Sequence, residues 1–582
     1  MSSSSSALTA LPLPVPSPST ADEREQKRSI TDFTISIPGS QARHSTYTST
    51  STTASDQSGK SRWWTQEFKF YIAVFVVVVP LMIAVPVRLS LPSHPNYWKF
   101  EHRLSDGWLF GRKVDNSDAQ YRTFRNNLLP LFLLSTVYLI ASHLQSRIPS
   151  TSSLYFYREK FILFFSISMI LLLHGISSFK ILGILWANYR VSKIRVEGTL
   201  KRIYPALLVV GNMAILFLNE RNEGYKFGNL HAALGSLDTW EGMLPRWHIG
   251  FNITMMRMVS FGLDYLWRDT AADSSAQIPT EYRERVKTSL LEDEYSFTSY
   301  LSYCLYPPLY IAGPIMTYND FTWQLRRPVT ITRRAQLSYA IRFLFSLLTM
   351  ESILHTMYVV VIKDLAAWEG NSPAEISMIG FWNLVIVWLK LLIPWRFFRL
   401  WALLDGVDPP ENMVRCVANN YSTLGFWRSW HRSYNLWVVR YIYVPVGGSK
   451  NAILATGLVF TFVALWHDLS FKLLAWGWLV SLFILPELVA TKIFSAGKYG
   501  SYWWYRHICA AGGVVNILLM MSANLVGFVL GIEGMRHLMI ELSSTISGWA
   551  FMAFACACLF VAVQVMFEYR EEEKRRGIDR RC

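Results

Sequence analysis

Long apolar runs recur along the whole chain, and they constrain its fold more than any other feature does. The longer ones are Phe68–Val87, Phe161–Ile176, Ile203–Leu218, Ile249–Trp267, Leu337–Ile362, Ile376–Leu403, Phe471–Ala490, Ile508–Leu530 and Ile546–Phe567; shorter ones are Leu128–Leu144, Phe179–Ala187, Phe297–Met316 and Ile453–Trp466. Several approach or exceed the ~20 residues that cross a hydrocarbon core as a helix. Because lipid cannot satisfy backbone polar groups, we predict an all-α polytopic membrane protein with about ten to twelve transmembrane helices and further re-entrant or interfacial helices.

Composition also favours a membrane protein. Hydrophobic residues make up 52% of the 582 residues and charged residues 17%, against roughly 25% charged in soluble domains. The excess of positive charge, +15, lies in short loops between apolar runs, which is typical of topology signals and contact with anionic membrane lipids rather than nucleic acid. The cysteines form no CxxC pair, so neither a disulfide framework nor a zinc site is expected.

The chain divides into three parts. Residues 1–60 are rich in Ser, Thr and Pro without apolar periodicity, which predicts a disordered tail. Residues 61–567 form the predicted transmembrane domain, in which the polar and aromatic segment from Arg88 to Asn127 suits the headgroup level. Residues 568–582 form a charged tail that we expect in the cytosol, because it is rich in Lys and Arg.

Loop charges predict the orientation of the helices. The segment RRPVTITRR, from Arg326 to Arg334, contains no acidic residue, whereas the loop from Lys363 to Glu375 has one basic and three acidic residues. Positive-inside counting places the first in the cytosol and the second across the membrane. Following the crossings along the chain puts His467 within the membrane, nearer the far side. Before these loops, Pro307-Pro308 and Gly313-Pro314 predict a broken helix that lines a cavity.

Two histidines are the strongest candidates for chemistry. His431 lies in FWRSWHRSYNLWVVRYIYVPVGGS, which is too polar for a lipid-facing helix and too aromatic for a solvated loop, and His467 follows the apolar run Ile453–Trp466. An ionisable side chain inside a membrane is a functional-site hypothesis by default. The alternative is a neutral imidazole that satisfies a neighbouring helix. Nearby side chains that we expect to bind substrate are Trp427, Arg428, Trp430, Arg432, Asn435, Trp466 and Asp468.

The stretches YPPLYIAGPIMTYNDF, FWRSWHRSYNLWVVRYIYVPVGGS and ALWHD together resemble the membrane-bound O-acyltransferase (MBOAT) family, within it the fungal glycerol uptake protein branch related to Hedgehog acyltransferase. The resemblance covers roughly Phe68 to Phe567. It implies many helices around a central tunnel, with acyl-CoA entering from the cytosol and the acceptor from the other side. His467 matches the family histidine, and His431 matches a second position that is Asn, Asp or His. Cys416, in NMVRCVANN, matches a cysteine that ligates haem in Hedgehog acyltransferase.

The chemistry of acyl transfer agrees with these residues. A base must take the proton of the attacking hydroxyl, and a donor must hold the charge that develops on the carbonyl oxygen. The chain has no GxSxG or HExxH motif, which argues against a serine hydrolase or a zinc protease. We therefore expect direct transfer without a covalent enzyme intermediate. This chemistry requires no cofactor, and the haem that the resemblance implies at Cys416 would be additional to it.

The leading interpretation is an enzyme, an acyl-CoA-dependent O-acyltransferase of the endoplasmic reticulum membrane, with the plasma membrane as the alternative location. By resemblance to the fungal branch, its acceptor would be the lysolipid form of a glycosylphosphatidylinositol (GPI) anchor. One alternative is a transporter for glycerol uptake by proton symport, because intramembrane histidines and broken helices also build solute pathways. Another is a catalytically idle sterol or lipid sensor.

Overall fold

The computed structural model describes residues 61–147, 154–229, 231–268, 282–327, 329–467, 471–578 and 580. In this part of the chain the regular structure is helical, and the β-pairing consists of one isolated bridge between Ser105 and Val114. The predicted all-α membrane architecture is therefore confirmed. The predicted tail of residues 1–60 lies outside the described residues.

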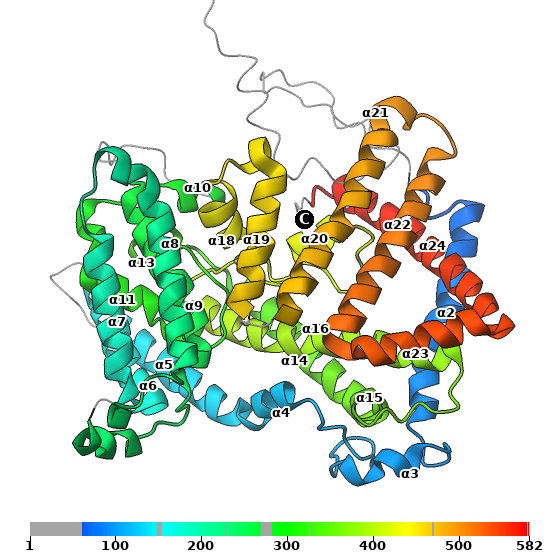
Figure 1. Cartoon of the computed structure of the whole chain (residues 1–582), viewed down its shortest axis with the longest axis horizontal. Helices are drawn as coiled ribbons and strands as arrows, with labels where there is room; N and C mark the ends of the chain where they lie inside the picture. The colour runs from blue at the N-terminus through cyan, green and yellow to red at the C-terminus, as the bar shows by residue number, and fades with distance from the viewer. Residues whose placement is uncertain are drawn as a thin grey trace, which may run out of the picture.

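The helices carry the labels of Figure 1. The first half of the chain contains α2 (Gln66–Leu89), α3 (Tyr97–Phe100), α4 (Ala119–Asn126), α5 (Leu128–Ser146), α6 (Leu154–His174), α7 (Ser177–Ser192), α8 (Gly198–Arg221), α9 (Trp247–Leu266), α10 (Tyr282–Lys287) and α11 (Phe297–Cys304). The second half contains α12 (Pro307–Tyr310), α13 (Tyr318–Arg326), α14 (Arg333–Thr356), α15 (Val359–Asp364), α16 (Pro373–Leu404), α17 (Thr423–Ser429), α18 (Arg432–Val438), α19 (Ala452–His467), α20 (Phe471–Ile493), α21 (Ala496–Tyr499), α22 (Tyr505–Asn524), α23 (Gly531–Ser544) and α24 (Ile546–Arg575). A π-helical turn follows α18 at Val439–Tyr443, and another follows α22 at Leu525–Val529.

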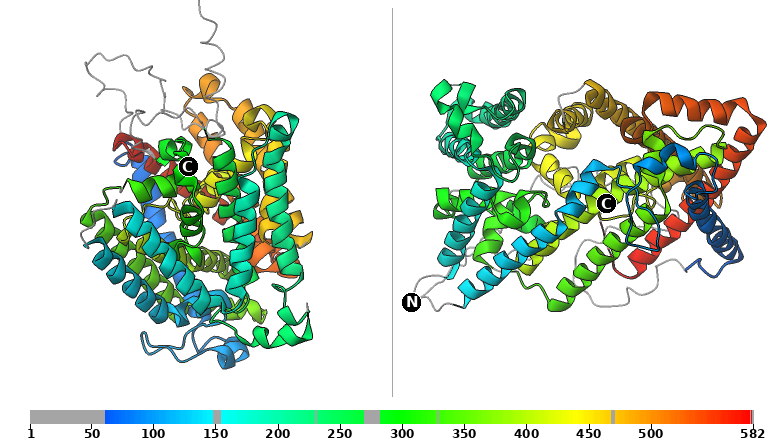
Figure 2. Two further views of the ribbon diagram at one scale, coloured as in Figure 1. Left: turned by 90° about the vertical axis from the view of Figure 1, so that its left-hand side faces the viewer. Right: turned by 90° about the horizontal axis from the view of Figure 1, so that it is seen from below.

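Eight helices of the described chain are long and apolar enough to cross a membrane: α2, α5, α8, α14, α16, α20, α22 and α24. Helices α6, α7, α9 and α19 pack against members of this set or against one another. Helices α5 to α11 gather on one side of the molecule, and α20 to α24 with α2 gather on the other (Figure 1). Seen from below, the long α14 and α16 run side by side across the molecule and join the two sides (Figure 2).

The ends of the helices define two faces. The backbone N–H of Arg62 donates to Glu568, and Arg506 pairs with Glu67 at 3.0 Å, so the start of α2, the start of α22 and the end of α24 lie together. We call this the tail face. On the opposite side, which we call the far face, the end of α2 meets the segment after α14, where the Tyr358 N–H donates to Ser90. In Figure 1 the tail face is uppermost, and α3, α4 and α15 lie at the bottom.

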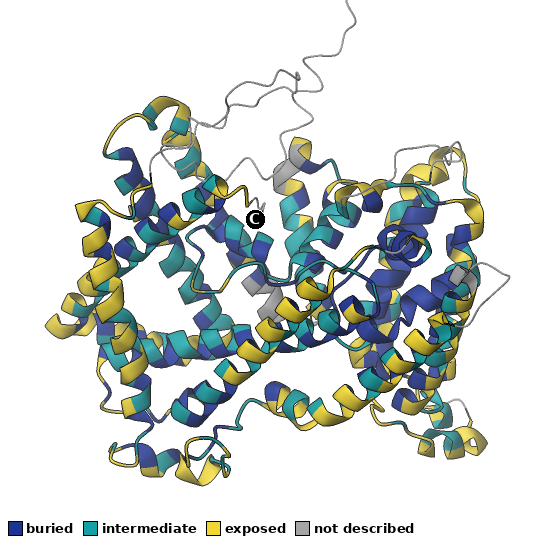
Figure 3. Ribbon diagram, turned by 180° about the vertical axis from the view of Figure 1, so that it is seen from behind, coloured by how far each residue is buried: buried dark blue, intermediate teal, exposed yellow. Residues whose placement is uncertain are grey.

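Burial separates a packed interior from a lipid-facing surface. Nearly every side chain of α9 from Thr254 to Tyr265 is buried, against α11 and α13. On α2 and α14, large apolar side chains such as Phe70, Val76 and Phe345 are exposed. Figure 3 shows the same contrast along the long helices. Exposed apolar side chains of this kind are expected where the solvent is lipid rather than water.

Candidate active site

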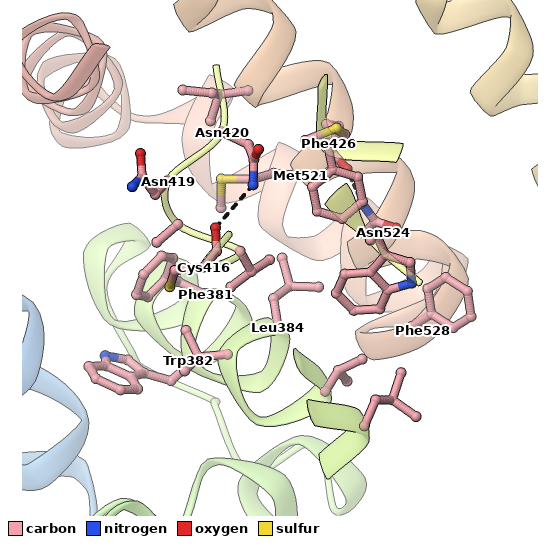
Figure 4. Close-up of a pocket in the computed structure, with 18 of the residues that line it drawn as sticks. Phe381, Trp382, Leu384, Cys416, Asn419, Asn420, Phe426, Met521, Asn524 and Phe528 are labelled. Atoms are coloured by element: carbon pink, nitrogen blue, oxygen red, sulfur yellow. Dashed lines mark hydrogen bonds between the residues drawn. The ribbon is translucent and has the colours of Figure 1, made fainter. Parts of the chain in front are cut away.

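An apolar cavity of about 1360 Å³ lies among the long helices. Its walls come from α2, α16, α22 and α24 on one side, and from the segment 416–438 and α19 on the other. Figure 4 shows Phe381 and Leu384 of α16 on one wall, with Cys416 and Phe426 on the loop and helix that face them. Binding sites for drug-sized ligands usually measure about 300–1,000 Å³. This cavity is larger, and its lining suits an acyl chain.

Both candidate histidines line this cavity. Tyr434 and Trp466 connect them: the His431 ring centroid lies 5.1 Å from that of Tyr434, and the His467 ring centroid lies 4.7 Å from that of Trp466. The Tyr434 and Trp466 rings are themselves 4.5 Å apart. His431 also stacks on Trp395 of α16 at 4.4 Å. The structure therefore brings together two histidines that are well separated in the sequence, within one aromatic cluster.

His431 is held in an unusual backbone conformation. Its φ of 44° and ψ of 49° place it in the left-handed region, immediately before α18. The next turn is fixed by Asn412, whose carbonyl accepts from the Arg432 N–H at 2.9 Å and whose side chain accepts from the Ser433 N–H at 3.1 Å. A non-glycine residue in this region costs of the order of 1–3 kcal/mol, and such residues gather at functional sites. The conformation turns the imidazole toward Trp395 and the cavity.

The predicted substrate-binding residues divide into two groups. Trp427, Trp430, Asn435 and Trp466 line the cavity with the histidines. Arg428 and Arg432 are not part of the described lining; Arg432 instead donates to the carbonyl oxygen of Arg580 at 2.9 Å. Asp468 lies outside the described residues.

Sequence reasoning missed Tyr434 and Trp395. Tyr434 lies three residues after His431, a spacing that would place both side chains on one face of a continuous helix, so the sequence did hold a signal for it; in the structure His431 instead immediately precedes α18. Trp395 belongs to a helix that ends before the histidine segment begins, and one sequence does not reveal contacts between separate helices. Trp395 was therefore not predictable as a partner of His431.

The predicted break between Phe297 and Met316 is confirmed. The chain forms α11, then the single turn α12, then an extended segment in which Ala312, Gly313 and Ile315 line the cavity. The extended segment is tied to the histidine turn, because the Ile315 N–H donates to the Ser433 hydroxyl at 2.9 Å. Gly313 is needed here, since a Cβ at this position would lie 2.5 Å from the Leu309 Cα.

A buried arginine stabilises this break. Arg257 of α9 donates to the carbonyl oxygens of Cys304 at 2.8 Å and of Tyr303 at 3.3 Å, and it also donates to that of Leu309. The last carbonyls of a helix lack intrahelical partners and carry partial negative charge. The guanidinium therefore satisfies the ends of α11 and α12 inside the protein.

Glu487, a buried carboxylate on the membrane-spanning helix α20, has a similar structural explanation. It accepts a hydrogen bond from the Ser422 hydroxyl and one from the Leu424 N–H at 3.3 Å. Both groups belong to the start of α17, where free N–H groups favour an anion. Glu487 thus anchors α17, which carries Trp427 on the cavity wall.

Cys416 lies on the wall of the cavity, which is the position that a haem ligand would need. Its side chain is exposed at the cavity, near Phe381 and Trp382 in Figure 4. Its loop is fixed, because Asn420 donates to the Cys416 carbonyl at 3.0 Å and Arg570 of α24 donates to the Asn419 carbonyl at 2.7 Å. A thiol held at the wall of an apolar cavity is compatible with a thiolate-ligated haem.

Comparison with known proteins agrees with this architecture. A model of the MBOAT, membrane-bound O-acyltransferase family, matches residues 129–532. The chain is 47% identical to "Membrane-bound O-acyltransferase GUP1" of Saccharomyces cerevisiae over 545 residues, covering 91% of this chain and 95% of that protein. It is 41% identical to the gup1 protein of Schizosaccharomyces pombe, covering 90% and 91%. A more distant relative is "Protein-cysteine N-palmitoyltransferase HHAT" of Mus musculus, 28% identical over 191 residues, or 31% of this chain and 38% of that protein. The chain therefore belongs to the membrane-bound O-acyltransferase family.

Proposed function

We propose that this protein transfers a fatty acyl group from acyl-CoA to a lipid hydroxyl, with His467 and His431 at the reaction centre. The observation that carries the proposal is the meeting of both imidazoles with Tyr434 and Trp466 on the wall of one apolar cavity. A membrane cavity without water would protect the thioester from hydrolysis and strengthen the electrostatic contacts around the reacting atoms.

In the proposed reaction, an imidazole nitrogen of His467 takes the proton of the acceptor hydroxyl as its oxygen attacks the thioester carbonyl carbon. The carbon–sulfur bond then breaks, and the departing CoA thiolate receives the proton. His431 would donate a hydrogen bond to the carbonyl oxygen while negative charge develops there. Its restrained backbone supports this role, because a fixed donor needs no rearrangement in the transition state.

The acceptor that we propose is a lysophosphatidylinositol moiety of GPI anchors, in the endoplasmic reticulum membrane. Support comes from the resemblance to the fungal branch; the names of the two yeast relatives specify O-acyl transfer and no acceptor. The name of the mouse relative specifies a cysteine acceptor for that protein. Its limited coverage of this chain leaves room for a different acceptor here.

The two substrates would enter from opposite faces. We propose that the tail face is cytosolic, since it gathers the start of α2 and the basic end of α24. Acyl-CoA is too polar to cross the membrane, so it would enter from this face. Arg415 and Arg432 lie there beside the C-terminal segment: Arg415 pairs with Glu573 at 2.9 Å, and Arg432 contacts Arg580. The acceptor would reach the histidines from the far face.

When bound, a haem on Cys416 would supply no step of acyl transfer. The Cys416 thiolate would hold it, next to Trp382. The transfer itself would require only this chain's own residues, the thioester and the acceptor.

The decisive experiment supplies membranes containing the protein with labelled acyl-CoA and a series of lysolipids, and identifies the labelled product by mass spectrometry. We expect a diacylated inositol phospholipid with the wild type and none with His467→Ala. A transporter would instead move glycerol into sealed vesicles without a thioester. Glycerol uptake with no acylated product would therefore contradict the proposal.

A further inference from the structure

The wall of the cavity carries one fully charged side chain among the described residues that line it, Lys390. It lies on α16, a membrane-spanning helix, and the neighbouring wall positions of that helix are apolar or aromatic, such as Val387, Leu391 and Trp395. A charged group at such a position is costly and is by default a functional-site hypothesis. Apolar binding sites use a small number of placed polar groups to orient their ligands. Lys390 is therefore the first candidate for such a group.

The ammonium group has capacity left for a ligand. It donates to Asp118 Oδ2 at 2.7 Å, and the side chains of this pair are 19% and 16% exposed. Asp118 is occupied on its other oxygen, because it also accepts from the Tyr121 N–H at the start of α4. A lysine ammonium has three N–H donors. Gln120, on the first turn of α4 and two residues after Asp118, also lines the cavity and adds an uncharged amide.

The position of this pair along the membrane normal suits a lipid headgroup. Asp118 and Gln120 belong to the segment between α2 and α5, which lies at the far face in Figure 1. The same segment exposes Trp98, Trp108 and Phe110, and aromatic side chains of this kind gather at the headgroup level of a bilayer. Lys390 thus lies where the cavity approaches the headgroups of the far leaflet.

Lys390 and the histidines are linked through α16. Lys390 precedes Trp395 by five residues, about 7.5 Å along the helix axis at 1.5 Å per residue, and Trp395 stacks on His431. A lipid whose phosphate lies at Lys390 would therefore extend along the same wall toward the imidazoles.

We propose that Lys390, with Gln120, binds the phosphate of an anionic acceptor lipid and so selects phosphate-bearing lysolipids over neutral glycerolipids. This inference rests on the proposed function and adds the residue that determines acceptor class. Asp118 then has a second role, because it holds the ammonium at the wall and partly offsets its charge until a phosphate arrives.

The test compares two acceptors in the purified full-length protein: lysophosphatidylinositol, which is anionic, and monoacylglycerol, which is neutral. Lys390→Met should lower kcat/KM for lysophosphatidylinositol at least about tenfold, the size of one charge-assisted hydrogen bond, and leave monoacylglycerol within about twofold. Asp118→Asn, which keeps an N-cap oxygen for α4, should raise the ratio of kcat/KM for lysophosphatidylinositol to that for monoacylglycerol. Lys113→Met is the matched control: this lysine pairs with Glu101 at 3.1 Å and is not among the described lining residues, so the ratio should stay unchanged.

Several outcomes would overturn the inference. If the ion pair only stabilises the fold, Lys390→Met and Asp118→Asn will each reduce transfer to both acceptors alike. The double variant Asp118→Asn/Lys390→Met leaves no unpaired charge, and it will then restore transfer to both acceptors. A raised KM for acyl-CoA with unchanged acceptor constants would assign Lys390 to the phosphates of the donor instead. Absence of transfer in the wild type would contradict the proposed function itself. Photolabelling with a photoactivatable lysophosphatidylinositol, without donor, then still measures whether Lys390→Met weakens lipid binding.

Discussion

At the scale of single residues, His431 combines two demands that limit its replacement. Its ring contacts Trp395 and Tyr434, and its backbone occupies the left-handed region. Histidine, asparagine and aspartate adopt this conformation more readily than most residues. The Asn, Asp or His that the resemblance implies at this position would therefore have a physical explanation in the backbone as well as in the chemistry.

This backbone constraint predicts an order among variants. His431→Asn should retain part of the acyl transfer, because Asn tolerates the left-handed conformation and can donate a hydrogen bond. His431→Ala should lose most activity, and His431→Val should also unfold at lower temperature, by the equivalent of about 1–3 kcal/mol. Thermal unfolding and turnover of the purified variants measure both effects. His431→Gly separates them: it keeps the left-handed backbone without strain, so we expect it to unfold at a higher temperature than His431→Val and to transfer as little as His431→Ala, and wild-type turnover in this variant would exclude a role for the imidazole.

The prediction for His467 is simpler. His467→Ala should abolish acyl transfer and leave the protein folded and inserted, because the base is lost while the Trp466 side of the wall remains. Turnover is compared with His143→Ala, which changes an exposed histidine near the end of α5 whose ring contacts the Leu139 carbonyl. We expect wild-type turnover in that control. Undiminished transfer by purified His467→Ala would remove His467 from the mechanism.

Haem binding at Cys416 has a spectroscopic test. The purified wild type should show a Soret band and bound iron, and Cys416→Ala should lose both, because a thiolate is the proposed axial ligand. Cys509→Ala, which changes a buried cysteine of α22, should keep them. A wild-type sample reconstituted with haem that shows neither signal would contradict the proposal.

The sequence revealed the two histidines because charge is rare in apolar runs, but it did not single out Lys390 in the same way. Lys390 lies within a run that is otherwise apolar and aromatic, and its partner Asp118 is far away in the sequence. Ion pairs between distant segments leave no local pattern. The absence of Arg428 and Arg432 from the described cavity lining has the same cause. The sequence places these residues near the site but does not show in which direction their side chains point.

At the scale of elements, the apolar runs predicted most long helices to within a few residues at each end. The clearest difference is the run Leu337–Ile362, which covers most of α14 and most of α15. The chain turns at Met357 and Tyr358, where the Tyr358 N–H donates to Ser90 of the far face. No Pro or Gly marks this turn, because a hydrogen bond from another segment stabilises it.

The break at α11 and α12 was predictable from its prolines, but the residue that stabilises it was not. Arg257→Met should unfold at a clearly lower temperature, because it leaves buried helix-end carbonyls without donors, each costing about 1–3 kcal/mol. Arg257→Lys should recover only part of the loss, since an ammonium lacks the planar fork that reaches several carbonyls. Thermal unfolding in detergent measures both. Equal stability of Arg257→Met and wild type would show that these contacts contribute nothing to the fold.

At the scale of the whole molecule, the loop charges and the structure agree on which segments share a face. The loop after α13 lies beside Glu294, to which Arg327 donates at 3.4 Å, and Gln336 near the start of α14 contacts Leu403 at the end of α16. From there the chain leads to Arg415, which pairs with Glu573 at the tail face. The end of α14 lies instead near Asp115, at the far face. Charge counting predicts on which side of the membrane a loop lies, but it does not predict how deep His467 lies in the membrane. That depth depends on how α19 packs against α20.

Sidedness decides whether the two substrates can enter from opposite faces. We expect a cysteine at exposed Arg334, at the start of α14, to react with an impermeant thiol reagent in sealed microsomes. A cysteine at exposed Glu101, on the far-face segment, should react only after the membrane is opened. Both are placed in a variant without the native cysteines whose acyl transfer is verified first, and that parent variant should stay unlabelled. Because α14 joins the two faces, equal labelling of both positions in sealed microsomes would contradict a membrane-spanning α14. If the cysteine at position 101 reacts in sealed microsomes and the cysteine at position 334 does not, the far face is the cytosolic one. Acyl-CoA would then enter from the far face, beside Lys390. In that case the ligand of Lys390 would not be the phosphate of an acceptor lipid from that leaflet.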